Sequence, residues 1–220
     1  MGAPVNPAVQ PAAAAQQRAR WLKAILPWHW VSSALTLAGL LAFAVTGITL
    51  NHAGAIESRA VVRSGTAQLT PEQQALLRRH APPGDAARAP LPEALRTALR
   101  AQGVVEGPAS ALAEWSADEV YLPLPRPGGD AWLRIDRATG ELEWEDADRG
   151  LVAWLNDLHK ARHTGVLWTV FIDIFAAACV LASATGLLLL ALHARRRPST
   201  WPLVAAGLVL PALLAVVAIH

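Results

Sequence analysis

Charged side chains are missing from three long stretches of the chain. No Asp, Glu, Lys or Arg occurs from Trp30 to Leu50 or from Trp201 to Ile219, and Asp173 is the only one from Thr164 to Leu192. Each stretch supplies the roughly 20 apolar residues that a helix needs to cross a bilayer about 30 Å thick. Because 53% of the residues are hydrophobic, the sequence excludes an ordinary soluble protein and predicts three transmembrane helices.

Cysteine and the usual catalytic motifs are also scarce. Cys179 is the single cysteine, so an intrachain disulfide is excluded, and its place in an apolar stretch indicates a small buried hydrophobe. The segment between the first two apolar stretches contains no Gly-rich phosphate loop, no Cys/His zinc spacing and no nucleophile with a partnered base. A flavin or nicotinamide motif is missing too. The chain therefore cannot collect electrons from NAD(P)H by itself. We also expect no nucleic acid partner.

Basic residues predict the orientation of the helices. Arg18, Arg20 and Lys23 precede the first apolar stretch, and residues 195–197, all arginine, lie between the second and third. Short basic segments stay in the cytoplasm by the positive-inside rule. We therefore expect the long segment between the first two helices on the opposite side, which is the periplasm if the membrane is a bacterial inner membrane.

The pattern gives a mainly α membrane protein with an inserted α+β domain. Pro27 is placed where a helix would start, and the segment from Asn51 to Gly54 is placed where it would stop, so the first helix is expected from about Trp28 to His52. The expected segments are a disordered cytoplasmic tail (1–20), transmembrane helix 1 (21–52), a periplasmic domain (53–158), helix 2 (159–193), a cytoplasmic loop (194–200) and helix 3 (201–220).

Inside the inserted domain, helices are followed by strands. Proline starts two helical segments, Pro71 to His80 and Pro92 to Gln102. Short segments with β-type residues then alternate with Pro-Gly-Gly and Ala-Thr-Gly turns. Asp136 and Gly140 indicate a hairpin, because Asp opens such turns and Gly supplies a positive φ. The expected strands are Ala111 to Ser116, Val120 to Pro125, Ala131 to Asp136 and Glu141 to Glu145.

A Thr-Gly step occurs in each of the first two helices. Thr46-Gly47 lies near the outer end of the first, and Thr185-Gly186 lies in the second. Because the two helices are antiparallel, this repeat indicates an inverted pseudo-symmetry. Small residues at such steps let a backbone approach a neighbouring helix or a flat ligand.

Histidines stand at both predicted membrane faces. About 35 Å of helix separates His29 from His52, so one marks each face. His193 returns to the face of His29, and His159 and His163 belong to the face of His52. Imidazole is a common axial ligand of haem iron, and facing helices are an established way to hold that cofactor. We therefore expect one or two b-type haems, with His29 and His193 inside and His52 with His159 or His163 outside.

Two further polar features leave alternatives open. His159 and His163 are four residues apart and would share one helix face, as zinc or copper ligands do, with Asp157 as a third ligand. Asp173 is an ionisable group inside a membrane helix, where such residues are costly and often functional. It could carry protons, act indirectly on a haem propionate, or pair with Ser32, Ser33 or Thr46.

A family resemblance rests on several of these segments. The sequence resembles the PepSY-associated transmembrane helix proteins of Gram-negative bacteria in Trp28-His29-Trp30, in the segment from Thr46 to His52, in the segment from Leu155 to Lys160 and in Thr164-Gly165. The hairpin from Asp136 to Glu141 is similar to the end of a PepSY domain. Larger relatives include inner-membrane ferric-siderophore reductases that carry b-type haem between histidines. The resemblance also favours His159, within Asn-Asp-Leu-His-Lys, as the outer ligand.

The resemblance implies an electron-transfer protein that acts on periplasmic ferric-siderophore or other metal complexes. PepSY domains elsewhere are similar to peptide-binding or protease-inhibiting modules, so a non-enzymatic adaptor that binds a periplasmic partner is the alternative. We expect membrane lipids and a periplasmic electron acceptor as partners, and we also consider a homodimer. The electron donor is not indicated by the sequence.

Overall fold

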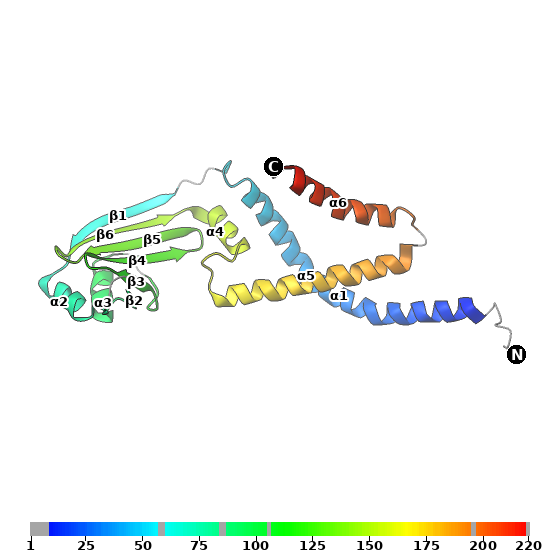
Figure 1. Ribbon diagram of the computed structural model, residues 1–220, viewed down its shortest axis with the longest axis horizontal. Coiled ribbons are helices and arrows are strands. Elements are labelled where there is room, and N and C mark those ends of the chain that lie inside the picture. Colours follow the sequence, from blue (N-terminus) through cyan, green and yellow to red (C-terminus); the bar gives the residue numbers. More distant parts are fainter. Residues whose placement is uncertain (1–8, 57–59, 84–86, 105–106, 195–196, 219–220) are drawn as a thin grey trace. The chain divides into compact units, whose positions relative to one another are not determined.

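The computed structural model describes residues 9–56, 60–83, 87–104, 107–194 and 197–218. The chain divides into two compact units, Met1–Leu41 with Phe171–His220, and Ala42–Val170. The first unit is helical, and the second contains a six-stranded sheet (Figure 1). Arg195, Arg196 and His220 lie outside the described residues.

Three helices are long and apolar enough to cross a membrane. They are α1 (Val9–Asn51), α5 (Val166–His193) and α6 (Thr200–Ala218), with the apolar part of α1 running from Ala15 to Asn51. This finding confirms the predicted fold class, together with the antiparallel sheet formed by the part of the sequence that follows α1 and precedes α5.

The start of α1 differs from the prediction. The helix passes through Pro27 and reaches back to Val9, so part of the segment expected to be a disordered tail is helical. Proline removes one backbone hydrogen bond, but the residues before it include Ala12 to Ala15, and alanine has the highest helix propensity. The predicted stop is confirmed, since α1 ends at Asn51.

Within the helical unit, α1 and α5 pack antiparallel. His29 contacts Thr185, and ten residues further along α1 a Cβ on Gly39 would lie 2.3 Å from the Phe175 ring. Gly39 is therefore a point of close approach, as small residues are in membrane helix pairs. Two polar side chains of α1, Ser32 and Thr36, are buried and donate to backbone carbonyls of their own helix.

The second unit contains one antiparallel sheet with strand order β1-β6-β5-β4-β3-β2. Helices α2 (Pro71–Arg79) and α3 (Glu93–Ala101) connect the first three strands of the sequence. Figure 1 shows the sheet with α2 and α3 beside it. The strands are β1 (Val61–Gln68), β2 (Ala87–Pro90), β3 (Leu112–Trp115), β4 (Glu119–Arg126), β5 (Gly129–Asp136) and β6 (Glu141–Asp148).

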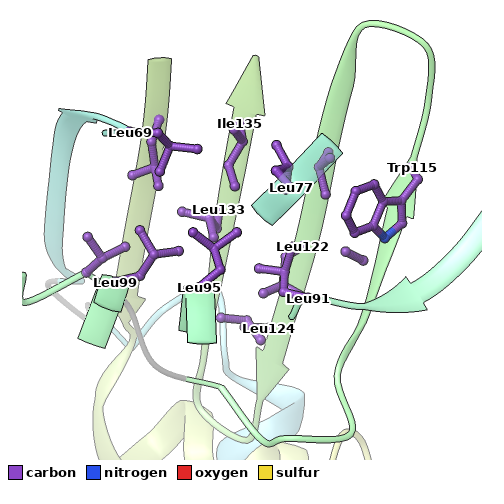
Figure 2. Close-up of a cluster of buried hydrophobic side chains, with 14 of the residues drawn as sticks. Leu69, Leu77, Leu91, Leu95, Leu99, Trp115, Leu122, Leu124, Leu133 and Ile135 are labelled. Carbon is purple, nitrogen blue, oxygen red and sulfur yellow. The ribbon is translucent and has the colours of Figure 1, made fainter. Parts of the chain in front are cut away.

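The core of this domain lies between α2, α3 and one face of the sheet. Leu77 of α2 and Leu95 and Leu99 of α3 point toward Leu122, Leu133 and the other inward residues of the strands (Figure 2). Inward positions alternate with outward ones along β4 and β5, as a half-buried sheet requires.

Local sequence signals explain several element ends. Thr70 and Gln73 form a capping box at the start of α2, with Pro71 in the first turn. The predicted helices and the four predicted strands are all present, with ends shifted by a few residues. Strands β1 and β2 were not predicted.

The predicted hairpin is also present, between β5 and β6. Asp136 Oδ1 accepts hydrogen bonds from the backbone N–H groups of Ala138 and Thr139, and Gly140 has a φ of 75°. The backbone hydrogen bond from Thr139 is the main cause that lowers the pKa of Asp136 below 3.8.

The boundary predicted for helix 2 is wrong at its start. Residues 159–193 do not form one helix, because α4 (Gly150–His159) ends first and α5 begins at Val166. Ala161 and His163 have φ values of 53° and 59°, and Gly165 has 79°, so the backbone leaves the helical region three times between the two helices. The Trp168 indole N–H then donates to the Leu158 carbonyl at the end of α4.

Candidate functional site: two histidine contacts on Thr-Gly steps

His29 of α1 lies against the Thr-Gly step of α5. Its Nδ1 is 3.0 Å from Thr185 Oγ1 and 3.2 Å from the Ala182 carbonyl oxygen. A Cβ on Gly186 would lie 3.3 Å from His29 Cε1, which leaves the ring just enough room beside the helix backbone. A carbonyl can only accept a hydrogen bond, so Nδ1 of His29 is the donor, and in the neutral ring Nε2 is then the nitrogen that can bind a metal.

An open groove beside this contact contains a second histidine. The groove has a volume of about 490 Å³, and its lining includes His29, Gly186, His193 and Arg197. His193 Nδ1 donates to the Leu189 carbonyl at 2.8 Å, so its Nε2 is also the unprotonated nitrogen. The structure thus brings the two predicted inner histidines, His29 and His193, to one groove.

His159 of α4 makes the corresponding contact in the second unit. Its Nδ1 is 2.7 Å from Thr46 Oγ1, and its ring centroid is 4.9 Å from that of Phe43. A Cβ on Gly47 would lie 3.7 Å from His159 Cε1, an ordinary contact distance. Asn156, three residues earlier, accepts a hydrogen bond from Thr49 at 3.0 Å. The end of α4 is thereby held on residues 43–49 by two side-chain hydrogen bonds.

The other two candidate histidines are less enclosed. His52 is exposed, and its Nδ1 donates to the Ile48 carbonyl of its own helix. His163 is exposed in the turn after α4. Within the described residues, no hydrogen bond or ring contact joins His52 to His159 or to His163. The predicted outer pair is therefore not formed by direct contact.

The alternative metal site does not have the geometry that the spacing predicted. His159 and His163 were expected on one helix face, but α4 ends at His159 and His163 has a positive φ. Asp157, the expected third ligand, accepts from the Gly128 N–H and from the Arg162 guanidinium. Across the described ranges, no group of three or more His, Cys, Asp or Glu side chains could hold a metal ion.

Comparison with known protein families shows the family of the chain. The PepSY_TM-like family matches residues 20–220. The chain belongs to this family. No curated protein and no solved structure matches the chain.

Asp173 of this PepSY_TM-like protein is exposed on α5. Ser32, one of its expected polar partners, donates to the Trp28 carbonyl of its own helix instead. In the parts of the chain that the structure describes, Asp173 makes no hydrogen bond or ion pair. Its predicted role stays a prediction.

Two contact residues of the PepSY_TM-like protein were missed by reasoning from sequence. Thr46 and Thr185 were noted as parts of small-residue steps, and Thr46 also as a possible partner of Asp173, but neither was expected to contact a histidine, as both hydroxyls do. Their shared signal was the repeat itself, since each threonine directly precedes the glycine that leaves room for a ring. Of the five candidate histidines, His29 and His159 are the two that are partly buried.

Proposed function

We propose that this PepSY_TM-like protein is a b-type haem protein of the bacterial inner membrane. In this proposal it passes electrons from a cytoplasmic or quinone donor to a ferric-siderophore or other metal complex in the periplasm. The observation that carries the proposal is the groove of the helical unit, which His29 and His193 both line, each with Nδ1 within hydrogen-bond distance of a backbone carbonyl and Nε2 left as the nitrogen that can bind a metal. A neutral imidazole in this form is an axial ligand of haem iron.

The residues of the groove fit the chemistry of a haem. Leu189 and Leu190 give it apolar walls, and Arg197 supplies a cation suited to a propionate. Its volume of about 490 Å³ lies in the usual range for cofactor sites. A haem with two imidazole ligands has no open coordination position, so it supplies one-electron transfer rather than oxygen chemistry. The chain's own residues would bind and orient this group.

The proposed orientation places the N-terminus in the cytoplasm and the sheet domain in the periplasm. It rests on Arg18, Arg20 and Lys23 before the apolar part of α1. Glu72→Cys in a Cys179→Ala chain supplies a single exposed thiol in the sheet domain. An impermeant maleimide should label it in whole spheroplasts. Labelling only after the inner membrane is broken would contradict the orientation.

A spectrum of the purified chain tests the proposed function. Protein from haem-replete cells should be red and should show the α band of a b-type haem in a reduced-minus-oxidised difference spectrum. Mixing the reduced protein with a ferric-siderophore should return the spectrum to the oxidised form. A colourless preparation would contradict the proposal.

The open face of the sheet favours a second candidate, an adaptor without an enzymatic role. On the face opposite the core, the rings of Tyr121 and Trp132 lie 6.5 Å apart, and Glu143 and Glu145 of β6 stand on the neighbouring strand. Arg134 of the same face lies 5.9 Å from the Trp132 ring centroid and 3.9 Å from Glu143, so the surface already binds one cation, and a basic segment of a periplasmic partner could bind in the same way. A colourless protein that binds such a segment would favour this adaptor.

A further inference from the structure

The two histidine contacts use the same three chemical parts. In each, a threonine hydroxyl lies within 3.0 Å of a histidine Nδ1, and the glycine that follows the threonine faces the Cε1 edge of that ring. Thr185 with Gly186 contacts His29, and Thr46 with Gly47 contacts His159. The same arrangement thus occurs twice, on different helices and in different units. A single histidine placed at a membrane interface by chance would not explain this repetition.

The hydroxyl protons are already used in both contacts. Thr185 Oγ1 donates to the Leu181 carbonyl at 2.7 Å, and Thr46 Oγ1 donates to the Ala42 carbonyl at 3.0 Å. A hydroxyl has one proton, so each oxygen is left to accept a hydrogen bond from the imidazole. The imidazole proton then has to reside on Nδ1, and Nε2 becomes the nitrogen that can bind a metal.

We propose that Thr46 and Thr185 are positioning residues that hold the rings of His159 and His29 with Nδ1 protonated and Nε2 free to bind haem iron. This inference rests on the proposed haem function. Both hydroxyls would act through the histidine rings that they contact. Partners that fix the tautomer and the ring orientation of a metal-binding histidine commonly change metal affinity by about 10–100-fold.

Thr36 provides a matched control for both threonines. It lies on α1, it is buried, and its hydroxyl also donates to the backbone carbonyl four residues earlier, at 2.9 Å. None of the hydrogen bonds described for Thr36 involves a histidine. Thr36→Val therefore removes a hydroxyl of the same kind, with a backbone hydrogen bond of the same kind, but no contact to an imidazole.

The test measures the histidine tautomers directly. The full chain, labelled with ¹⁵N-histidine and purified without added haem, should show His29 and His159 with Nδ1 protonated. Thr185→Val should change the nitrogen shifts of His29, and Thr46→Val should change those of His159. Thr→Ser at either position should restore them, and Thr36→Val should leave both unchanged. An Nε2-protonated His159 in the unsubstituted chain would overturn the inference.

Haem binding by the same variants separates this inference from the proposed function. Haem titration of Thr46→Val and Thr185→Val should show affinity weakened by about 10-fold or more, with shifted redox midpoints, and the serine variants should recover. Weakening equal to that of Thr36→Val would overturn the inference and leave the haem function standing. Nδ1-protonated rings in a chain that binds no haem would support the tautomer assignment and contradict the haem function.

The two glycines offer a second test that keeps both hydroxyls. A Cβ at Gly186 would lie 3.3 Å from His29 Cε1, whereas one at Gly47 would lie 3.7 Å from His159 Cε1. Gly186→Ala should therefore displace the His29 ring and shift the His29 nitrogen resonances. Gly47→Ala should shift the His159 resonances far less. Equal effects of the two variants would contradict the ring positions on which the inference depends.

Discussion

The sheet domain closes its apolar side chains inside itself, whereas the membrane-spanning helices leave most of theirs exposed. Leu95, Ile135 and Leu142 are 0% exposed in the sheet domain, but only 6% of the apolar part of α5 and none of α6 is buried. The hydrophobic effect drives the packing of the sheet domain, because folding removes its apolar surface from water. Lipid tails are as apolar as leucine, so helices in a bilayer gain little from burying leucine and associate through small and polar residues.

This difference explains where the specific contacts of each region lie. In the sheet domain, the packing contacts are made mainly by leucines on one face of the sheet. In the helical unit, the close contacts are made by Gly39, Thr185 and Gly186, which pack against an aromatic or imidazole ring. Substituting leucines should therefore damage one region and scarcely affect the other.

The largest expected effect is on the sheet core. Leu95→Ala should destabilise the domain by about 2–5 kcal/mol, since it leaves a cavity in a fully buried site. Thermal unfolding and limited proteolysis of the domain would measure this loss. The haem proposed for the His29 and His193 groove should be retained, because that groove belongs to the other unit. Leu208→Ala on the exposed face of α6 is the control, and loss of this groove haem in Leu95→Ala would show that the two regions depend on each other.

A smaller effect is expected at Asp157, which ties α4 to the sheet. Its carboxylate accepts from the Gly128 N–H at 2.9 Å and from Arg162 Nε at 3.0 Å. Asp157→Asn keeps only one acceptor oxygen, so the domain should lose about 1–2 kcal/mol, chiefly through the buried N–H, since the Arg162 side chain is 51% exposed. Urea denaturation would measure it. Asp130→Asn breaks a more exposed ion pair with Arg149, and an equal loss there would refute this ranking.

The smallest expected effect concerns pH and the β5–β6 hairpin. Because hydrogen bonds lower the pKa of Asp136 below 3.8 in the folded chain, its carboxylate stabilises the hairpin fully above about pH 4. That contribution is lost as pH falls through the lowered pKa. Asp136→Asn should therefore lower domain stability slightly at pH 7 and flatten its decline below pH 4. An unchanged acid limb in the variant would show that the hairpin carboxylate is not coupled to folding.

Sequence reasoning found the features that depend on runs and turns. Uncharged stretches gave the three membrane helices, and Asp136 with Gly140 gave the hairpin, because hydropathy and positive φ leave strong local signals. Strand β1 was missed since Val61–Gln68 contains Arg63, Ser64 and Gly65 and is mostly exposed at the sheet edge.

The histidine contacts were only partly accessible to sequence reasoning. His29 and His193 could be paired from their depths along antiparallel helices, and the groove contains both. The turn between α4 and α5 could not be foreseen, because Ala161 has a positive φ although alanine rarely adopts one. The sequence left His159 and His163 open as the outer histidine, and His159 is the one that contacts a Thr-Gly step.

Paired histidine substitutions test the central claim most directly. Haem stoichiometry, Soret position and redox midpoint should be measured for His29→Ala, His193→Ala and the control His80→Ala, whose Nδ1 also donates to a helix carbonyl but in the sheet domain. The first two variants should lose or perturb the same haem and look alike, because each removes one imidazole from the same groove. His80→Ala should match the unsubstituted protein. Full haem content with an unchanged Soret band and midpoint in both groove variants would contradict the account.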